Sequence, residues 1–274
     1  MSTTGPSDAL PPFRRVPAAA GLRWWREGWR SFLRAPGPWA GLAAALIAVL
    51  WLGGHLPFGG LLTQWLSLPL FALGAVFSML LRRRWLDARR ITPAGMPLET
   101  PTEGTLGASA RLWTGRIGPL LLASLLVLVI GGGAGAVLVI GLGAALGIGL
   151  ASLTTLSHMM SPQVGMMAGA GAAGGLMGLL LLMLLALYLI NVAFWFVNTL
   201  VAIGGLRPWN AVVLSARAGF ANVGAITVFT LVLLPLGLLA MLPAGLGLLV
   251  LLPVLSGASY TSYHEVFDPA EPAV

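Results

Sequence analysis

The stretch RRRWLDARRITPAGMPLETPTEGTLGASARLWTGR, from Arg82 to Arg116, holds seven of the fifteen arginines in this 274-residue chain. The chain on either side of it is almost wholly apolar. No Asp, Glu, Lys or Arg occurs in residues 35–81, 117–206 or 218–264. Since about 20 apolar residues suffice to cross a bilayer, each of these runs can hold at least two crossings. The sequence therefore predicts an all-α polytopic membrane protein in which the quoted stretch is a hydrophilic loop.

The composition agrees with this class. Charged residues make up 8% of the chain, against roughly 25% in soluble domains. No cysteine is present, which excludes disulfides and thiolate metal sites, and every basic residue is arginine. A net charge of +7 is typical of proteins that bind nucleic acid or an anionic membrane surface. Because most of the chain must lie in lipid, we expect anionic lipids on the cytoplasmic side as partners, and no nucleic acid.

Gly and Pro residues divide the apolar runs into six expected spans. Between them lie the cytoplasmic loop 82–116 and an external Gly- and Met-rich segment, 140–176. For that segment we consider helical extensions, an interfacial helix and two short insertions. Together these parts form one membrane domain, 18–268, between a disordered N-terminal tail, 1–17, and a C-terminal tail, 269–274. The expected spans cover about 36–53, 58–81, 117–139, 177–204, 221–241 and 246–263.

The charged residues predict the orientation of the chain. In the six-span arrangement, residues 1–34, 82–116, 207–217 and 264–274 share one side of the membrane. They hold all 15 arginines and all 8 acidic residues. By the positive-inside rule this side faces the cytoplasm. We therefore expect a multi-pass protein with three hairpins of spans and with both termini in the cytoplasm.

The first arginine-bearing segment, 18–34, has the spacing of an amphipathic helix. One face carries only apolar side chains, and arginines occupy the other face. This pattern predicts a helix lying in the membrane interface, with its tryptophans at the level of the lipid headgroups. The residues of the apolar face are Leu22, Trp25, Trp29, Phe32 and Leu33.

Three segments share a common pattern ahead of an apolar run. In each, an arginine is followed seven residues later by a glycine, and an aromatic residue comes two or three residues after the arginine. We expect three cytoplasmic surface helices, each entering a hairpin through a bend at the glycine. The pairs are Arg30 and Gly37, Arg111 and Gly118, and Arg217 and Gly224. The expected lipid-facing basic residues are Arg30, Arg111, Arg217, Arg82, Arg83 and Arg84.

Two further patterns bear on function. Tyr188, Asn191, Trp195 and Asn198 recur at helical spacing in the fourth expected span. Such a polar stripe either forms hydrogen bonds between helices or lines the path of a neutral solute. His264-Glu265 begins like a zinc-peptidase motif, but Asp268 replaces the second histidine, and two ligands fall short of the usual three. We therefore expect no catalytic residue, no metal and no cofactor.

Three short stretches carry a resemblance to a known family: Leu22–Arg34 (LRWWREGWRSFLR), Ala193–Phe196 (AFWF) and Ser259–Phe267 (SYTSYHEVF). They resemble an uncharacterised six-helix inner-membrane family of Gram-negative bacteria. That family is similar in layout to the membrane domains of some glycerophosphodiester phosphodiesterases. The resemblance implies a six-helix fold and a place in a bacterial inner membrane, and it implies no activity.

These observations lead to one main hypothesis and two alternatives. The main hypothesis is a non-enzymatic integral membrane protein that binds lipid or a partner protein through its basic cytoplasmic face. The first alternative is a transporter or channel for a neutral or lipid-like solute, which would use the polar stripe. An enzyme of lipid metabolism ranks last. A second copy of the chain or another membrane protein is left open as a partner.

Overall fold

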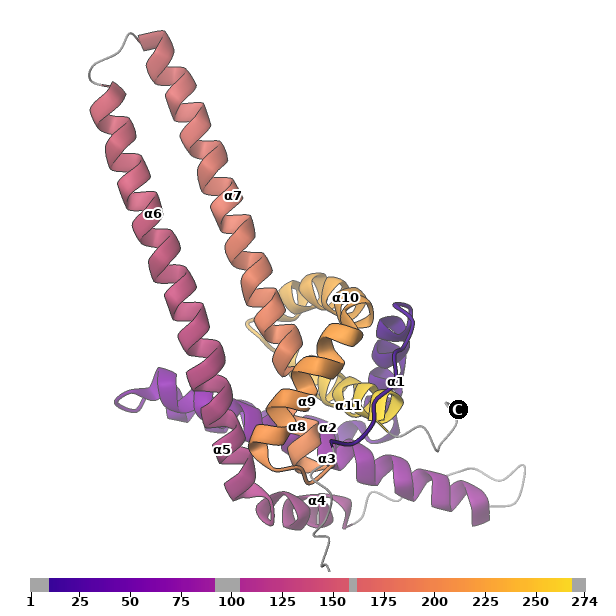
Figure 1. Cartoon of the computed structure of the whole chain (residues 1–274). Helices are drawn as coiled ribbons and strands as arrows, with labels where there is room; N and C mark the ends of the chain where they lie inside the picture. The colour runs from indigo at the N-terminus through magenta and orange to yellow at the C-terminus, as the bar shows by residue number, and fades with distance from the viewer. Residues whose placement is uncertain (1–9, 92–103, 158–161, 268–274) are drawn as a thin grey trace, which may run out of the picture. The chain divides into compact units, whose positions relative to one another are not determined.

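The computed structural model describes residues 10–91, 104–157 and 162–267, and every regular element in these ranges is a helix (Figure 1). Five helical segments are long and apolar enough to cross a membrane. This confirms the prediction of an all-α protein with several potential membrane-spanning helices. The five segments are Pro36–Gly54, Gly59–Ala88, Ile117–Ala145, Met177–Ala202 and Val223–Met241.

The chain forms two compact units, of which the first comprises residues 1–126 and 193–274. Three times in this unit a shorter helix is followed by a longer one, with one or two residues between them. The pairs are α1 (Ala20–Arg34) with α2 (Pro36–Gly54), α4 (Thr105–Thr114) with α5 (Ile117–Val127), and α9 (Pro208–Ala221) with α10 (Val223–Met241). The remaining helices are α3 (Gly59–Ile91), α8 (Val197–Ala202) and α11 (Leu248–Phe267).

The repeated pattern has the same register in all three pairs, because Gly37, Gly118 and Gly224 are each the second residue of the longer helix. The expectation that these glycines form the bends is wrong. The helices break two or three residues earlier, for example at Ala35, whose φ of −152° lies outside the helical region. Pro36 explains this break, since a proline disfavours helical geometry in the residue before it.

Helix α11 lies at the centre of the first unit, where it packs against α1, α2, α3, α8 and α10. It is not among the five strongly apolar helices, so the sixth span expected at 246–263 is not confirmed on hydropathy. The hydropathy of α11 is lowered by its C-terminal half, which carries several hydroxyl groups, His264 and Glu265. A helix surrounded by protein needs no lipid-compatible surface, so it can carry polar groups that find partners within the fold.

Helix α1 approaches its neighbours through glycines. A Cβ atom added to Gly28 would lie 2.3 Å from the main-chain oxygen of Val254 on α11, and one added to Gly257 would lie 3.0 Å from Gly28 Cα. Similarly, a Cβ atom on Gly21 would lie 2.3 Å from the main-chain oxygen of Ala225 on α10. These contacts bring the backbones of the helices together, as small residues do in membrane bundles.

The buried face of α1 therefore differs from the face predicted by its apolar residues. Trp24 and Trp25 are buried beside the two glycines, whereas Leu22, Trp29 and Leu33 are about half exposed. The apolar spacing predicts a face towards the membrane interface and gives no weight to glycine, which determines how closely α1 can approach α10 and α11. The exposed residues remain suited to contact lipid.

Tryptophan side chains join several helices of the first unit. In each case the indole N–H donates to a main-chain oxygen of another helix, which satisfies a polar group that would be costly to bury alone. The bonds run from Trp25 to Phe229 (3.0 Å), Trp39 to Ser31 (3.1 Å), Trp65 to Leu121 (3.0 Å) and Trp113 to Pro69 (2.6 Å).

The second unit, residues 127–192, is a helical hairpin. It consists of a π-helical turn, η1 (Leu128–Gly132), followed by α6 (Gly133–Ser157) and most of α7 (Pro162–Phe194). The segment expected to be external, 140–176, continues these two helices as far as the structure describes it, and its place outside the membrane stays a prediction. At ~1.5 Å per residue, the 33 residues of α7 extend about 50 Å, well beyond the ~30 Å of a hydrocarbon core.

Candidate functional site

The three arginines of the repeated pattern are all exposed. Arg30, Arg111 and Arg217 lie three or four residues before the end of α1, α4 and α9. A positive charge at this end of a helix is favoured by the helix dipole. Arg30 also forms an ion pair with Glu27 on the same helix. The predicted basic residues of the short helices are thus available to an anionic surface.

The other predicted basic residues belong to a helix rather than a loop. The expectation that a loop begins at Arg82 is wrong, because α3 continues without a break to Ile91. Arg82 and Arg84 are partly buried, and Arg83 is exposed. Helix formation continues here because Arg, Leu, Trp and Ala are compatible with a helix, and the first Pro and Gly come only after residue 92.

Arg34, which was not among the predicted site residues, lies against α3. Its guanidinium carbon is 4.4 Å from the centre of the Trp85 ring, a distance typical of a cation–π contact. Burial lowers the pKa of the Arg34 guanidinium, Glu27 raises it, and the nearby charges of Arg82 and Arg30 lower it further. Two neighbouring guanidinium groups, those of Arg82 and Arg30, therefore act on the charge of Arg34.

A buried core brings these arginines together. Trp39 on α2 and Phe77 on α3 meet edge to face, with ring centres 4.7 Å apart, and Ala35 and Leu81 complete the cluster. The sequence contains a signal for this arrangement: Arg34 is the last charged residue before the first apolar run. Arg82 is the first charged residue after it, and the two ends of a helical hairpin meet.

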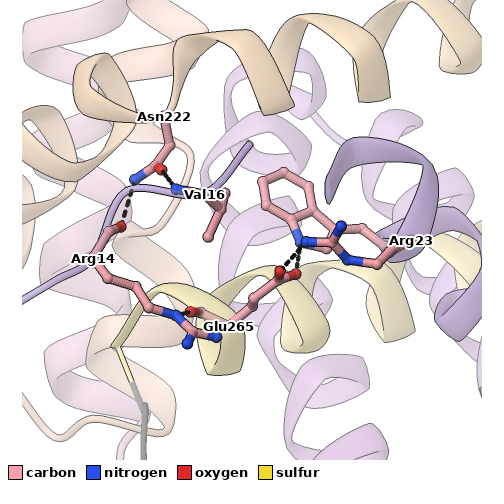
Figure 2. Close-up of polar contacts among 6 residues, drawn as sticks. Arg14, Val16, Arg23, Asn222 and Glu265 are labelled. Carbon is pink, nitrogen blue, oxygen red and sulfur yellow. Dashed lines mark hydrogen bonds and ion pairs between the residues drawn. The ribbon is translucent and has the colours of Figure 1, made fainter. Parts of the chain in front are cut away.

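Glu265, near the end of α11, joins the C-terminal helix to α1 (Figure 2). Its buried carboxylate accepts a hydrogen bond from Trp24 Nε1 at 2.8 Å and pairs with the guanidinium of Arg23. The main-chain oxygen of Glu265 accepts a further bond from Arg14 Nε. Burying a carboxylate is costly unless it is paired and hydrogen-bonded, and both conditions are met here.

Asn222, in the break between α9 and α10, holds the segment that precedes α1 (Figure 2). Its Oδ1 accepts from the main-chain N–H of Val16 at 2.7 Å, and its Nδ2 donates to the main-chain oxygen of Arg14 at 3.2 Å. The N–H of Arg14 donates in turn to the oxygen of Val266 at 2.9 Å. We call the contacts of Arg14, Val16, Asn222 and Glu265 the terminal clasp.

The terminal clasp was not predicted from the sequence. The tail 1–17 was expected to be disordered, but its residues Arg14 and Val16 make specific bonds, and residues 1–9 lie outside the described range. Its polar and Pro-rich composition is typical of disorder. Composition therefore gave no indication that its main chain bonds to Asn222 and to α11. In the sequence, His264-Glu265 was interpreted only as part of a metal site, and the bonding of Glu265 to α1 was not predicted.

The polar stripe does not form one continuous helical face. Tyr188 and Asn191 belong to the second unit, and Asn191 is exposed. Trp195 and Asn198 belong to the first unit, beyond the point where α7 ends and before or within α8. Ser215 bridges that break, accepting from Phe196 N–H at 3.0 Å and donating to Ala193 oxygen at 2.8 Å.

The two later members of the stripe differ in their bonding. Trp195 donates to Ser262 Oγ on α11 at 3.4 Å, which is the interhelical role that the sequence raised as one alternative. Asn198 Oδ1 is buried and has no hydrogen-bond partner within the described residues. The solute-path alternative stays a prediction.

The residues considered for metal binding do not assemble in the described ranges. His264 is buried, with its ring centre 6.0 Å from that of Tyr260, and Asp268 lies outside the described residues. Within those residues, no three His, Cys, Asp or Glu side chains come close enough together to hold a metal ion.

Comparison with known proteins found no matching family model, no matching curated protein and no matching solved structure. The resemblance to a six-helix inner-membrane family therefore stays a prediction.

Proposed function

We propose that the chain is a non-enzymatic integral protein of a bacterial inner membrane, whose exposed arginines bind anionic lipids at the cytoplasmic surface. One observation carries this proposal. Arg30, Arg111 and Arg217 are all exposed and occupy the same place, near the end of a short helix and ahead of a long one. Each arginine near such a surface contributes about 1 kcal/mol of attraction to anionic lipid.

The arrangement of aromatic side chains supports the same proposal. Trp29 and Leu33 are exposed on α1, and Trp209 and Phe220 are exposed on α9. Aromatic residues favour the headgroup level, where their apolar rings and the neighbouring cations are both satisfied. The short helices thus combine charge with apolar surface, as helices that lie in the interface do.

The terminal clasp supports six crossings with both ends on one side. The rings of Phe13 and Phe267 lie 6.4 Å apart, and Arg14 bonds to Val266. Contacts between the start of the chain and the end of α11 require an even number of crossings. We propose α11 as the sixth, because its 20 residues span ~30 Å, enough for a hydrocarbon core.

The test compares two triple variants in lipid nanodiscs. Replacing Arg30, Arg111 and Arg217 with Gln should lower the retention of phosphatidylglycerol relative to phosphatidylcholine, measured by lipid mass spectrometry after purification. Replacing the same three arginines with Lys keeps the charges and should keep the retention. If the Gln variant retains as much phosphatidylglycerol as the parent, these arginines act only during insertion and the proposed function is wrong.

A further inference from the structure

Arg34 differs from the exposed arginines of the short helices because it is held against an aromatic ring. Arg34 is only partly exposed, and its guanidinium group lies over the Trp85 ring. A guanidinium carries five N–H donors, yet that of Arg34 donates to no residue that the structure describes. An oriented group of donors on a fixed ring is suited to an anion with several acceptor oxygens.

Among the residues that the structure describes, the charges that act on this guanidinium are predominantly positive. Arg82 and Arg30 both act unfavourably on the charge of Arg34, and Glu27 is the acidic residue that acts favourably. Glu27 also forms an ion pair with Arg30. Since like charges that are brought together in a partly buried site repel one another, a bound anion would stabilise this arrangement more than it would stabilise an isolated surface arginine.

The position of the cluster indicates which anion. Arg34 comes two residues before the membrane-spanning segment of α2, and Arg82 follows the charge-free part of α3. Leu33, next to Arg34, is 57% exposed, and the core of Trp39 and Phe77 holds the two helices together beneath. The guanidinium groups thus lie where two apolar helices end, which is the depth of lipid phosphates.

We propose that Arg34, Arg82 and Trp85 form a binding site for the phosphate group of an anionic phospholipid, whose acyl chains lie along the apolar surface of α2. The site rests on the proposed lipid-binding function, and it assigns one lipid to one defined place. Arg34 supplies the oriented donors, Trp85 fixes the plane of its guanidinium, and Arg82 adds the second positive charge.

The test uses four single variants in nanodiscs that contain phosphatidylglycerol and phosphatidylcholine. Arg34→Gln and Arg34→Lys should each lower the retained phosphatidylglycerol about fivefold, the former by loss of charge and the latter by loss of the planar group. Trp85→Leu should lower it by a similar factor. The control is Arg26→Gln on the same helix, an exposed arginine that is not among the charges acting on Arg34; its retention should change less than about twofold.

The outcomes separate the site from the proposed function. If Arg34→Lys retains phosphatidylglycerol like the parent while Arg34→Gln and Arg26→Gln lose it equally, attraction is diffuse, the site is wrong and the function stands. If no variant changes retention, the site is wrong, whereas the proposed function is refuted only if the Gln triple variant of Arg30, Arg111 and Arg217 also retains the lipid. The melting temperature of each variant in nanodiscs of phosphatidylcholine alone identifies a variant that has lost its fold. If Arg34→Gln or Trp85→Leu has lost its fold, the retention measured for the conservative variant Arg34→Lys decides whether the site exists.

A second measurement distinguishes a lipid from a soluble anion. Millimolar inorganic phosphate is added to the parent protein in nanodiscs of phosphatidylcholine only. We expect little change in melting temperature, in contrast to the rise produced by phosphatidylglycerol. An equal rise with phosphate, absent in Arg34→Lys, would show that the occupant is a soluble phosphate and would overturn the assignment to lipid.

Discussion

The substitution Glu265→Ala should destabilise the protein mainly through its effect on Trp24. Trp24 is fully buried and donates its indole N–H to the Glu265 carboxylate. Leaving that donor unpaired costs about 1–3 kcal/mol. The side chain of Arg23 is 42% exposed, so water replaces its lost partner at a cost of roughly 0.5 kcal/mol. The expected loss is therefore about 2–3 kcal/mol in the free energy of unfolding.

Glu265→Gln provides the matched control. The amide oxygen of Gln can still accept from Trp24, so this variant should lose only the ion pair with Arg23, or about 1 kcal/mol or less. Denaturant titration in detergent micelles measures both losses. A double-mutant cycle adds Trp24→Phe, which removes the donor itself, so that Glu265→Ala should cost about 1 kcal/mol less in that background. Equal losses for the Ala and Gln variants, or an unchanged cost of Glu265→Ala in the Trp24→Phe background, would refute the reasoning.

Three further predictions concern packing, the terminal clasp and topology. Gly28→Ala should destabilise the protein by about 1–3 kcal/mol, because the added Cβ meets the backbone of α11. The control Gly41→Ala, which has open space around the added Cβ, should be neutral or stabilising by up to ~1 kcal/mol. Equal effects of the two substitutions on the free energy of unfolding would contradict the close contact. Asn222→Ala should speed tryptic cleavage after Arg14 and Arg15, whereas Asn210→Ala should not; unchanged cleavage would mean that Asn222 does not hold the segment. Single cysteines introduced into this cysteine-free chain at residues 10, 100, 212 and 270 should be labelled only from the cytoplasm, and those at residues 55 and 155 only from outside, so external labelling at residue 100 would exclude the proposed orientation.

Local patterns predicted the helices well. The long charge-free runs indicated apolar helices, and the seven-residue spacing between Arg30 and Gly37 reappears as a common register in three helix pairs. Such signals depend on residues that are close in sequence, because the hydrophobic period and helix-breaking residues determine directly where a helix forms and ends. A helix, α11, does occur where the sixth span was expected, but its polar C-terminal half prevents hydropathy from marking it as a span.

Contacts between distant residues could not be predicted in this way. Trp24 and Glu265 are separated by 241 positions, and the partner of a polar side chain at that distance leaves no periodic trace in one sequence. The buried face of α1 could not be predicted for the same reason, since Gly28 is recognisable as a contact residue only when the position of Val254 is known. The α2–α3 hairpin brings Arg34 and Trp85 together. The charge pattern of the sequence indicated this hairpin, but the residues at its two ends were interpreted one at a time.

The terminal clasp also has a consequence for the order of events during biosynthesis. Arg14, Arg23 and Trp24 precede Glu265, whose oxygens accept their hydrogen bonds, by 251, 242 and 241 residues. The Glu265 carboxylate meets its partners on α1, so these bonds can form only after the whole intervening chain has been made. Until α11 has been synthesised, the face of α1 that carries Trp24 and Gly28 therefore lacks the neighbour against which it packs in the finished fold.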